Sequence, residues 1–144
     1  MIATRFSVAT HIMLLMTIEP ASRLTSPRIA GSVNTNPVVV RRIMRLLAQA
    51  GLVRVRRGQG GAALGRPAER ISLDDVWIAV NPVRLPLLPL HANPDPECPV
   101  GRHVPRVLGE RFEAAEIAMR AALAAITLDA VAVQISKAAK ALAG

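Results

Sequence analysis

The sequence predicts a mainly α-helical fold with one small β-hairpin. Two helix starts, Ser26-Pro27 and Asn36-Pro37, stand ten residues apart, and a strand-turn-strand pattern follows them. A hydroxyl or amide side chain before proline is a strong helix start, because the side chain caps free N–H groups and proline fits the first turn. Farther along the chain, apolar residues repeat with heptad spacing. Of the 144 residues, 51% are hydrophobic, so the chain can bury a core.

The first three predicted helices form one unit. Apolar residues at helical spacing predict a helix over 4–19. Ser26 is the expected N-cap of a second helix over 27–33, and Asn36 is the expected N-cap of a third over 37–50. Because only a short turn separates the second helix from the third, this pair has the spacing of a helix-turn-helix.

A basic β-hairpin is predicted after the third helix. Residues 52–56 alternate between apolar and basic side chains, as in a half-buried strand, and the turn over 57–61 is rich in glycine. Residues 62–64 supply the return strand. A helix-turn-helix followed by such a hairpin is a winged helix, so we expect a winged helix-turn-helix domain over 1–80.

A short helix and a proline-rich loop come next. Ser72 and Asp75 have the spacing of a capping box for a helix that ends at Val80, with Trp77 as its large buried side chain. Six prolines fall within 81–100, and proline excludes both helix interior and central strand. We therefore expect a loop over 81–100, and we treat it as a candidate sensor loop.

A long helix over about 101–125 is predicted to pair two copies of the chain. It contains Pro105, so it kinks there or begins later. Its apolar residues recur at spacings of four and three, the pattern of a coiled-coil seam. The expected dimer interface comprises Leu108, Phe112, Ala115, Met119, Ala122 and Ile126. The alternative is a stripe that packs on its own domain. With a final helix capped by Thr127, residues 101–144 form the expected helical dimerisation region.

The positive charge lies in the first half of the chain. Residues 1–66 contain ten arginines and one acid, Glu19, for a net charge of +9, whereas residues 67–144 have a net charge of −1. Such an excess is typical of a protein that neutralises nucleic-acid phosphates. Two phenylalanines, one tryptophan and no tyrosine offer little stacking surface for single-stranded bases. Double-stranded DNA is therefore the expected partner, and no membrane partner is expected because no long apolar run occurs.

DNA contacts are expected from one face of the third helix and from the hairpin. The opposite face of the helix is apolar and comprises Val39, Val40, Ile43, Leu46, Leu47 and Ala50. Arg41 and Arg42 suit bidentate contact to guanine in the major groove, and Arg45, one turn later, suits a phosphate. A solvated basic face is the alternative explanation. The expected DNA-binding residues are Arg5, Ser26, Arg28, Asn36, Val38, Arg41, Arg42, Arg45, Arg56, Arg57 and Gln59.

The chain resembles a known family along nearly its whole length. Residues 30–43 (AGSVNTNPVVVRRI), 50–53 (AGLV) and 58–62 (GQGGA) look like the bacterial Rrf-two family of winged-helix transcription regulators. Residues 94–101 (PDPECPVG) look closest to its single-cysteine, YwnA-like branch. The resemblance implies a homodimer that swaps or pairs its long C-terminal helix, DNA contact through the helix from Pro37 and the wing, and repression as the commonest outcome.

Cys98 is the single cysteine, which bears on compartment and cofactor. No intrachain disulfide is possible, so a reducing, cytoplasmic location is expected, with a secretory signal over 6–18 as the alternative.

Cluster-binding members of the resembled family carry three closely spaced cysteines. With one soft ligand, no iron–sulfur cluster, other cofactor or metal is expected. A mixed metal site of His91, Cys98 and His103 is the alternative.

The position of Cys98 also makes it a candidate redox sensor. It stands just before a helix start, and Arg102 and His103 follow, a positive setting that favours thiolate. An inert cysteine packed beneath the loop is the alternative.

Together these patterns predict a sequence-specific DNA-binding transcriptional regulator, a repressor that binds a palindromic operator as a homodimer. No enzyme activity is expected. One alternative is a nonspecific nucleic-acid-binding or architectural protein that uses the same arginines. The other is a cysteine-dependent enzyme with Cys98 as nucleophile and His91 or His103 as base. The sequence leaves the effector unknown.

Overall fold

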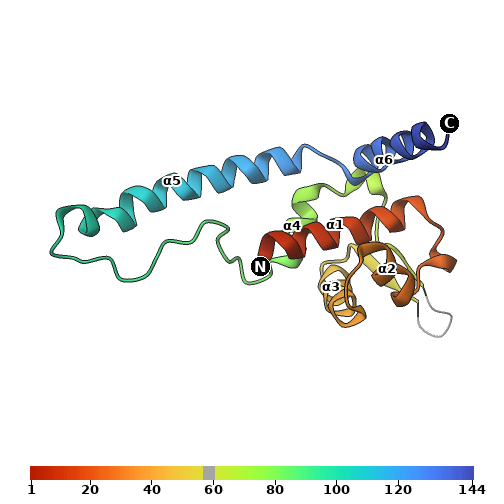
Figure 1. Cartoon of the computed structure of the whole chain (residues 1–144), viewed down its shortest axis with the longest axis horizontal. Helices are drawn as coiled ribbons and strands as arrows, with labels where there is room; N and C mark the ends of the chain where they lie inside the picture. Colours follow the sequence, from red (N-terminus) through yellow and green to blue (C-terminus); the bar gives the residue numbers. More distant parts are fainter. Residues whose placement is uncertain (57–60) are drawn as a thin grey trace.

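The computed structural model describes residues 1–56 and 61–144. Within these ranges the predicted fold class is confirmed: the chain is mostly helical, with one two-stranded antiparallel hairpin (Figure 1). The elements are α1 (Ile2–Ile18), the short 3-10 helix η1 (Ala21–Arg23), α2 (Ser26–Val33), α3 (Pro37–Gln49), β1 (Val53–Val55), β2 (Ala62–Leu64), the 3-10 helix η2 (Ala68–Arg70), α4 (Leu73–Val80), α5 (Pro99–Ala124) and α6 (Leu128–Ala143).

Side-chain caps begin both helices of the helix-turn-helix, α2 and α3. As predicted, Asn36 caps α3: its Oδ1 accepts a hydrogen bond from the Val38 N–H at 2.8 Å. The predicted cap of α2 is wrong by one residue. Thr25 is the cap, with its Oγ1 accepting from the Arg28 N–H at 3.3 Å, and Ser26 is the first helical residue. Of the two adjacent hydroxyl residues, Thr25 is the one whose backbone is extended, as a cap requires.

The predicted hairpin forms the wing and is attached tightly to the end of α3. Its strands pair antiparallel, with Val55 opposite Ala62. A Cβ at Gly65 would collide with the carbonyl oxygen of Gly51, so glycine is needed where the return strand passes the helix end. The hairpin therefore packs directly against the end of the helix-turn-helix.

One hydrophobic core joins α1, the helix-turn-helix, the hairpin, α4 and part of the C-terminal segment. Its largest fully buried side chains are Ile12, Met13, Leu24, Ile29, Ile43, Leu47, Leu52, Ile71, Leu128, Val40, Val76 and Val80. The capping box of Ser72 and Asp75 is present at the start of α4. Trp77 is buried as predicted, and its ring meets that of Phe6 edge to face, with centroids 5.4 Å apart.

The C-terminal helix α6 returns to this core, which divides the predicted dimerisation region. Leu128 and Ala132 are buried within the N-terminal domain. The chain just before α6 also runs beside the start of α4, where the Leu73 N–H donates to Ile126 O at 2.9 Å and the Leu128 N–H donates to Ile71 O at 2.8 Å. Within its own chain α6 therefore packs on α1 and η2, and its place in a dimerisation region over 101–144 stays a prediction.

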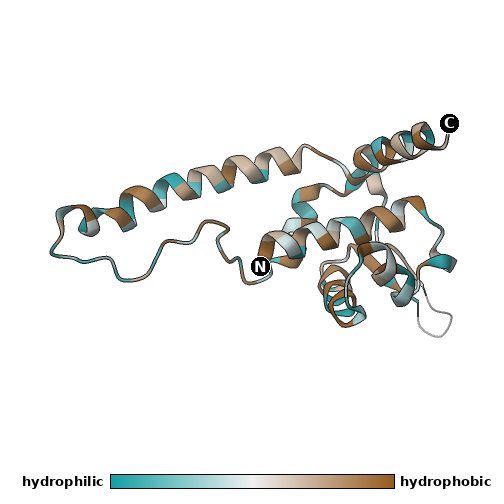
Figure 2. Cartoon of the chain, in the orientation of Figure 1, coloured by the Kyte–Doolittle hydropathy of each residue, from teal (hydrophilic) through white to brown (hydrophobic). Residues whose placement is uncertain are grey.

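In contrast, α5 projects from the domain, and the loop over 81–98 runs along it (Figure 1). No residue of α5 is buried, although apolar residues recur along it (Figure 2). The helix continues through Pro105, its seventh residue, where the proline removes one backbone hydrogen bond of the helix. The long helix is thus attached to the rest of its own chain mainly at α4.

Candidate nucleic-acid interface

The outward face of α3 presents the side chains expected to meet DNA. Arg41, Arg42 and Arg45 are exposed, while the inward face, with Val40 and Ile43 among its residues, is buried. The amphipathic division predicted from spacing is therefore present. It places three guanidinium groups along one side of a helix that is firmly packed on the other.

The first turn of α3 adds two exposed valines to this face. Val38 is 56% exposed, as expected for a contact residue. Val39 was expected on the buried face and is instead 41% exposed, because the first turn extends beyond the core that Val40 enters. Sequence reasoning missed Val39 as a surface residue. Helical angle alone assigns it inward, and only its place at the helix end argues otherwise.

Asn36 has a structural role in the same turn. Its side-chain oxygen is used by the Val38 N–H, so only its NH₂ group remains as a donor. Asn36 can therefore offer a base edge mainly the hydrogen-bond donors of this NH₂ group.

The wing extends the cationic surface beyond α3. Arg54 and Arg56 are exposed on and just after β1. Within residues 1–56 and 61–144, no ion pair involves these two guanidinium groups or those of Arg41, Arg42 and Arg45. Arg57 and Gln59, also expected at DNA, lie outside the described residues. The three arginines of α3 and the two of the wing thus carry positive charge that no acid of the described chain neutralises. This charge is available to phosphates.

The remaining expected contacts are arranged differently. The guanidinium of Arg5 donates to the Val80 carbonyl oxygen at 3.1 Å and so joins α1 to the end of α4. Arg28 pairs with Glu19, the one acid of the first 66 residues, although its side chain is still 46% exposed. Ser26 lies in the first turn of α2 and is partly exposed. The structure therefore does not present Arg5 and Arg28 as free cations like those of α3.

Cys98 is partly exposed and occupies the N-cap position of α5. The backbone N–H groups of Gly101 and Val100, in the first turn of the helix, lower the pKa of its thiol from the ordinary value. His91 and His103 are exposed nearby in sequence. Among the described residues, no group of three or more His, Cys, Asp or Glu side chains is placed to hold a metal ion, so the alternative site of His91, Cys98 and His103 is not assembled.

The predicted seam of α5 is divided between two environments. Leu108, Ala115, Ala122 and Ile126 are exposed, whereas Phe112 and Met119 are partly covered. Phe112 lines a cavity against the loop of its own chain.

None of the helices described in 1–56 and 61–144 combines the length and hydropathy needed to cross a bilayer.

Comparison with known proteins agrees with this geometry. The sequence pattern of the Rrf2 family, described as "Iron-dependent Transcriptional regulator", matches residues 2–134. YwnA of Bacillus subtilis (strain 168), which is named as an HTH-type transcriptional regulator, is 42% identical over 128 residues, covering 89% of this chain and 94% of YwnA.

Solved structures extend the likeness to the fold. A crystal structure described as a DNA-binding protein is 38% identical with a TM-score of 0.71, covering 88% of this chain and 97% of the other. A structure described as a transcriptional regulator from Lactobacillus plantarum has a TM-score of 0.72 at 25% identity, covering 92% of this chain and 89% of that one.

Proposed function

This chain belongs to the Rrf2 family of transcriptional regulators, and from that premise we propose that it represses transcription by binding a palindromic operator as a homodimer. The observation that supports this most strongly is the set of uncompensated arginines on α3 and the wing. A helix with an apolar inner face and a cationic outer face fits the major groove, and its first residues approach base edges.

In this proposal the interface residues have distinct roles. Val38 and Arg41 or Arg42 meet base edges, because they lie in the first turns of α3. Arg45 and Arg56 meet phosphates, and the proposal keeps Arg57 and Gln59 as wing contacts. Asn36 and Arg5 act mainly within the fold, since each has an intrachain hydrogen bond. Arg28 reaches a phosphate only in competition with Glu19.

The proposed dimer uses α5. This helix carries no buried residue, and Leu108 on its seam is 36% exposed. Ile126, the last residue of the predicted seam, lies beyond the end of α5 at Ala124 and is 39% exposed. Ala115 and Ala122 between them allow a second helix to approach closely. A dimer with two-fold symmetry presents two α3 helices related by the same axis, which is why the operator is expected to be palindromic.

We propose that regulation does not use an iron–sulfur cluster, in spite of the family's description. The donor set does not fit such a group. Cys98 is the single cysteine of the sequence, and a protein-bound cluster needs several soft ligands. The thiol of Cys98 is instead the proposed redox-sensitive group, supported by its partial exposure and lowered pKa.

The test is selection of a binding site from random duplexes, followed by competition against unselected DNA. A regulator is expected to prefer the selected duplex by ~10³ or more. A variant with Arg41, Arg42 and Arg45 changed to Ala is expected to lose binding, whereas Arg106→Ala on α5 is a matched control outside this surface. Equal affinity for selected and random duplexes would favour the nonspecific architectural protein.

A further inference from the structure

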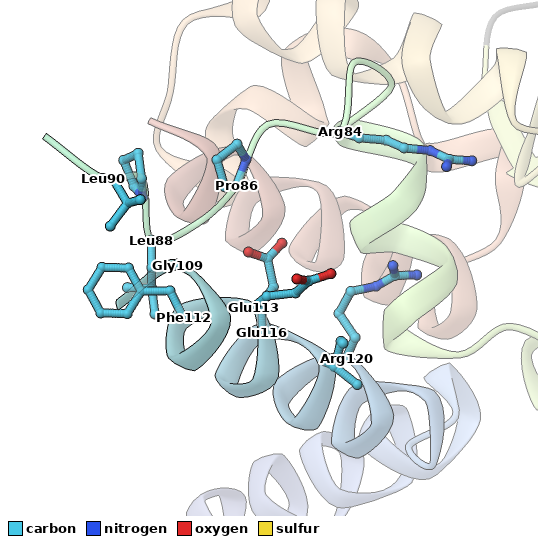
Figure 3. Close-up of a pocket in the computed structure, with 11 residues that line it drawn as sticks. Arg84, Pro86, Leu88, Leu90, Gly109, Phe112, Glu113, Glu116 and Arg120 are labelled. Carbon is cyan, nitrogen blue, oxygen red and sulfur yellow. The ribbon is translucent and has the colours of Figure 1, made fainter. Parts of the chain in front are cut away.

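A half-open cavity of about 640 Å³ lies between α5 and the loop segment 84–90 (Figure 3). None of its lining residues belongs to α3 or to the described part of the wing. Its apolar walls come from both sides. The loop contributes Pro86, Leu88, Pro89 and Leu90, and α5 contributes Phe112 and Ile117. Cavities of ~300–1,000 Å³ with apolar walls and a few polar groups are typical of small-molecule sites.

Hydrogen bonds hold the loop in place over the helix. Asn81, which is only 6% exposed, donates from Nδ2 to Leu85 O at 2.9 Å and accepts at Oδ1 from the Leu85 N–H at 3.0 Å. Farther along, the Leu87 N–H donates to Glu116 Oε2 at 3.0 Å. Prolines on either side of Leu87 and Leu88 restrict the backbone further. The cavity is therefore bounded by a loop that is fastened at its start and again above α5.

The polar groups at the centre of the cavity are carboxylates. Figure 3 shows Glu113 and Glu116 side by side on α5, both turned toward the loop. Glu116 has one hydrogen bond, to Leu87. Within the described part of the chain, Glu113 has neither an ion pair nor a side-chain hydrogen bond.

The two arginines at the edge of the cavity do not neutralise Glu113. Arg120 makes a bidentate pair with Asp74 of α4, from Nε to Oδ1 at 2.9 Å and from Nη2 to Oδ2 at 3.0 Å. Its charge interacts mainly with Asp74 and to a lesser extent with Glu116, which lies between Arg120 and Glu113 along the helix. Arg84 extends away from both glutamates (Figure 3). The interior therefore combines apolar walls with two carboxylates, of which Glu113 has no ion pair within the described part of the chain.

We propose that this cavity binds a small organic cation with an apolar body. The carboxylates of Glu113 and Glu116 attract the positive charge, and the ring of Phe112 favours a cation over its face. The apolar part of the ligand contacts the prolines and leucines of the loop. An anion of the same shape is repelled by the carboxylates. Because the loop joins the DNA-binding domain to α5, such a ligand is a candidate effector, a role that rests on the proposed function.

The experiment measures binding without DNA, so its result is independent of the proposed function. Tetraphenylphosphonium and tetraphenylborate have the same shape and opposite charge, and isothermal titration calorimetry measures each with the full chain. Tetraphenylphosphonium is expected to bind saturably with one site per chain, at least about tenfold more tightly than tetraphenylborate. In Glu113→Gln its affinity is expected to fall at least about tenfold, whereas Glu110→Gln should bind like the unmodified chain.

The control and a second variant separate charge from folding. Glu110 lies on the same helix, pairs with Arg106 and does not line the cavity. Gly109→Leu adds a side chain beneath Leu90, where a Cβ already reaches van der Waals distance, and it fills the cavity without changing charge. It is expected to remove binding while improving local helix propensity. Absence of saturable binding, equal binding of both probes, or undiminished binding by Glu113→Gln would overturn the proposal.

Discussion

Individual side chains in the first turns of α3 divide between folding and recognition. Asn36 caps the helix and Val40 enters the core, while Val38, Val39, Arg41 and Arg42 remain exposed. The exposed set combines apolar groups, which suit a thymine methyl, with guanidinium groups, which suit guanine. Recognition at this turn is thus expected to depend on both kinds of side chain.

Substitution of single arginines should separate base recognition from phosphate contact. Arg41→Ala is expected to cost ~1–3 kcal/mol on the selected operator and to relax base preference at one position in each half-site. Arg56→Ala is expected to weaken all duplexes alike and to flatten the dependence of affinity on salt. Fluorescence anisotropy with matched and mismatched duplexes at several salt concentrations measures both effects. Unchanged operator affinity in both variants would contradict the proposed docking.

Cys98 should react as a thiolate at lower pH than an ordinary cysteine. The N–H groups of Gly101 and Val100 lower its pKa, so at a given pH below the ordinary thiol pKa a larger fraction is ionised. The rate of alkylation by iodoacetamide, measured against pH, is therefore expected to rise at lower pH in the folded chain than in the chain unfolded by urea. Coincident profiles would show that the fold does not activate the thiol.

The same thiol should link oxidation to DNA binding. A thiolate attacks one peroxide oxygen, forming sulfenic acid as the O–O bond breaks and water leaves after protonation. Peroxide is expected to weaken operator binding by the native chain, with recovery after dithiothreitol. Cys98→Ser is the control, and an equal response from both proteins would leave Cys98 as a packing residue.

Two contacts hold α3 and α5 in place. The start of α3 is stabilised by its cap, and the position of α5 is set by its contact with α4. The bidentate pair of Arg120 and Asp74 is the side-chain link between α5 and α4, and the Arg120 pKa is raised mainly by that hydrogen bond. The loop that precedes α5 runs along the helix and is fastened to it by the hydrogen bond from the Leu87 N–H to Glu116. These contacts set the direction in which α5 leaves the DNA-binding domain.

Asn36 provides a direct test of capping against base recognition. Asn36→Ala is expected to lower the free energy of unfolding by ~0.5–2 kcal/mol, because a free N–H at the start of α3 loses its partner. Asn36→Ser should restore most of that stability, since serine also caps, and should leave the preferred operator unchanged. Urea denaturation and binding-site selection are the two measurements. A stable Asn36→Ser protein with an altered preferred base would identify Asn36 as a base-reading residue.

For the whole molecule, the arrangement separates a compact DNA-binding body from a projecting helix. α6 completes the body, with Leu128 in its core, and α5 extends beyond it (Figure 1). Two copies joined through α5 would therefore hold their α3 helices at a defined spacing. In the proposed dimer, operator recognition would therefore depend on dimerisation.

The dimer is tested by introducing charge into the exposed seam. Leu108→Glu combined with Ala115→Glu is expected to give monomers, because two like charges would meet at each level of a paired helix. Val133→Glu, on the exposed side of α6, should leave the dimer intact. Analytical ultracentrifugation at micromolar concentration distinguishes the two states. A monomeric unmodified protein would contradict the proposal.

Local signals in the sequence determined the elements of this protein. The caps at Asn36, Ser72 and Thr127, the proline-rich loop and the alternating hairpin act within a few residues, so each was visible without the fold. The cationic face of α3 was equally accessible, because helical spacing places its arginines together. The resemblance to the family rested on residues 30–62, which include α3, and on residues 94–101.

Only the tertiary structure decided which distant groups meet. Arg5 is held by Val80, Leu87 is bonded to Glu116, and α6 is packed on α1, although no periodicity in the sequence relates these segments. A repeating pattern reports which side of an element is apolar, but it carries no information about the partner that covers that side. The cavity beside Glu113 depends on such contacts, because its walls come from both the loop and α5.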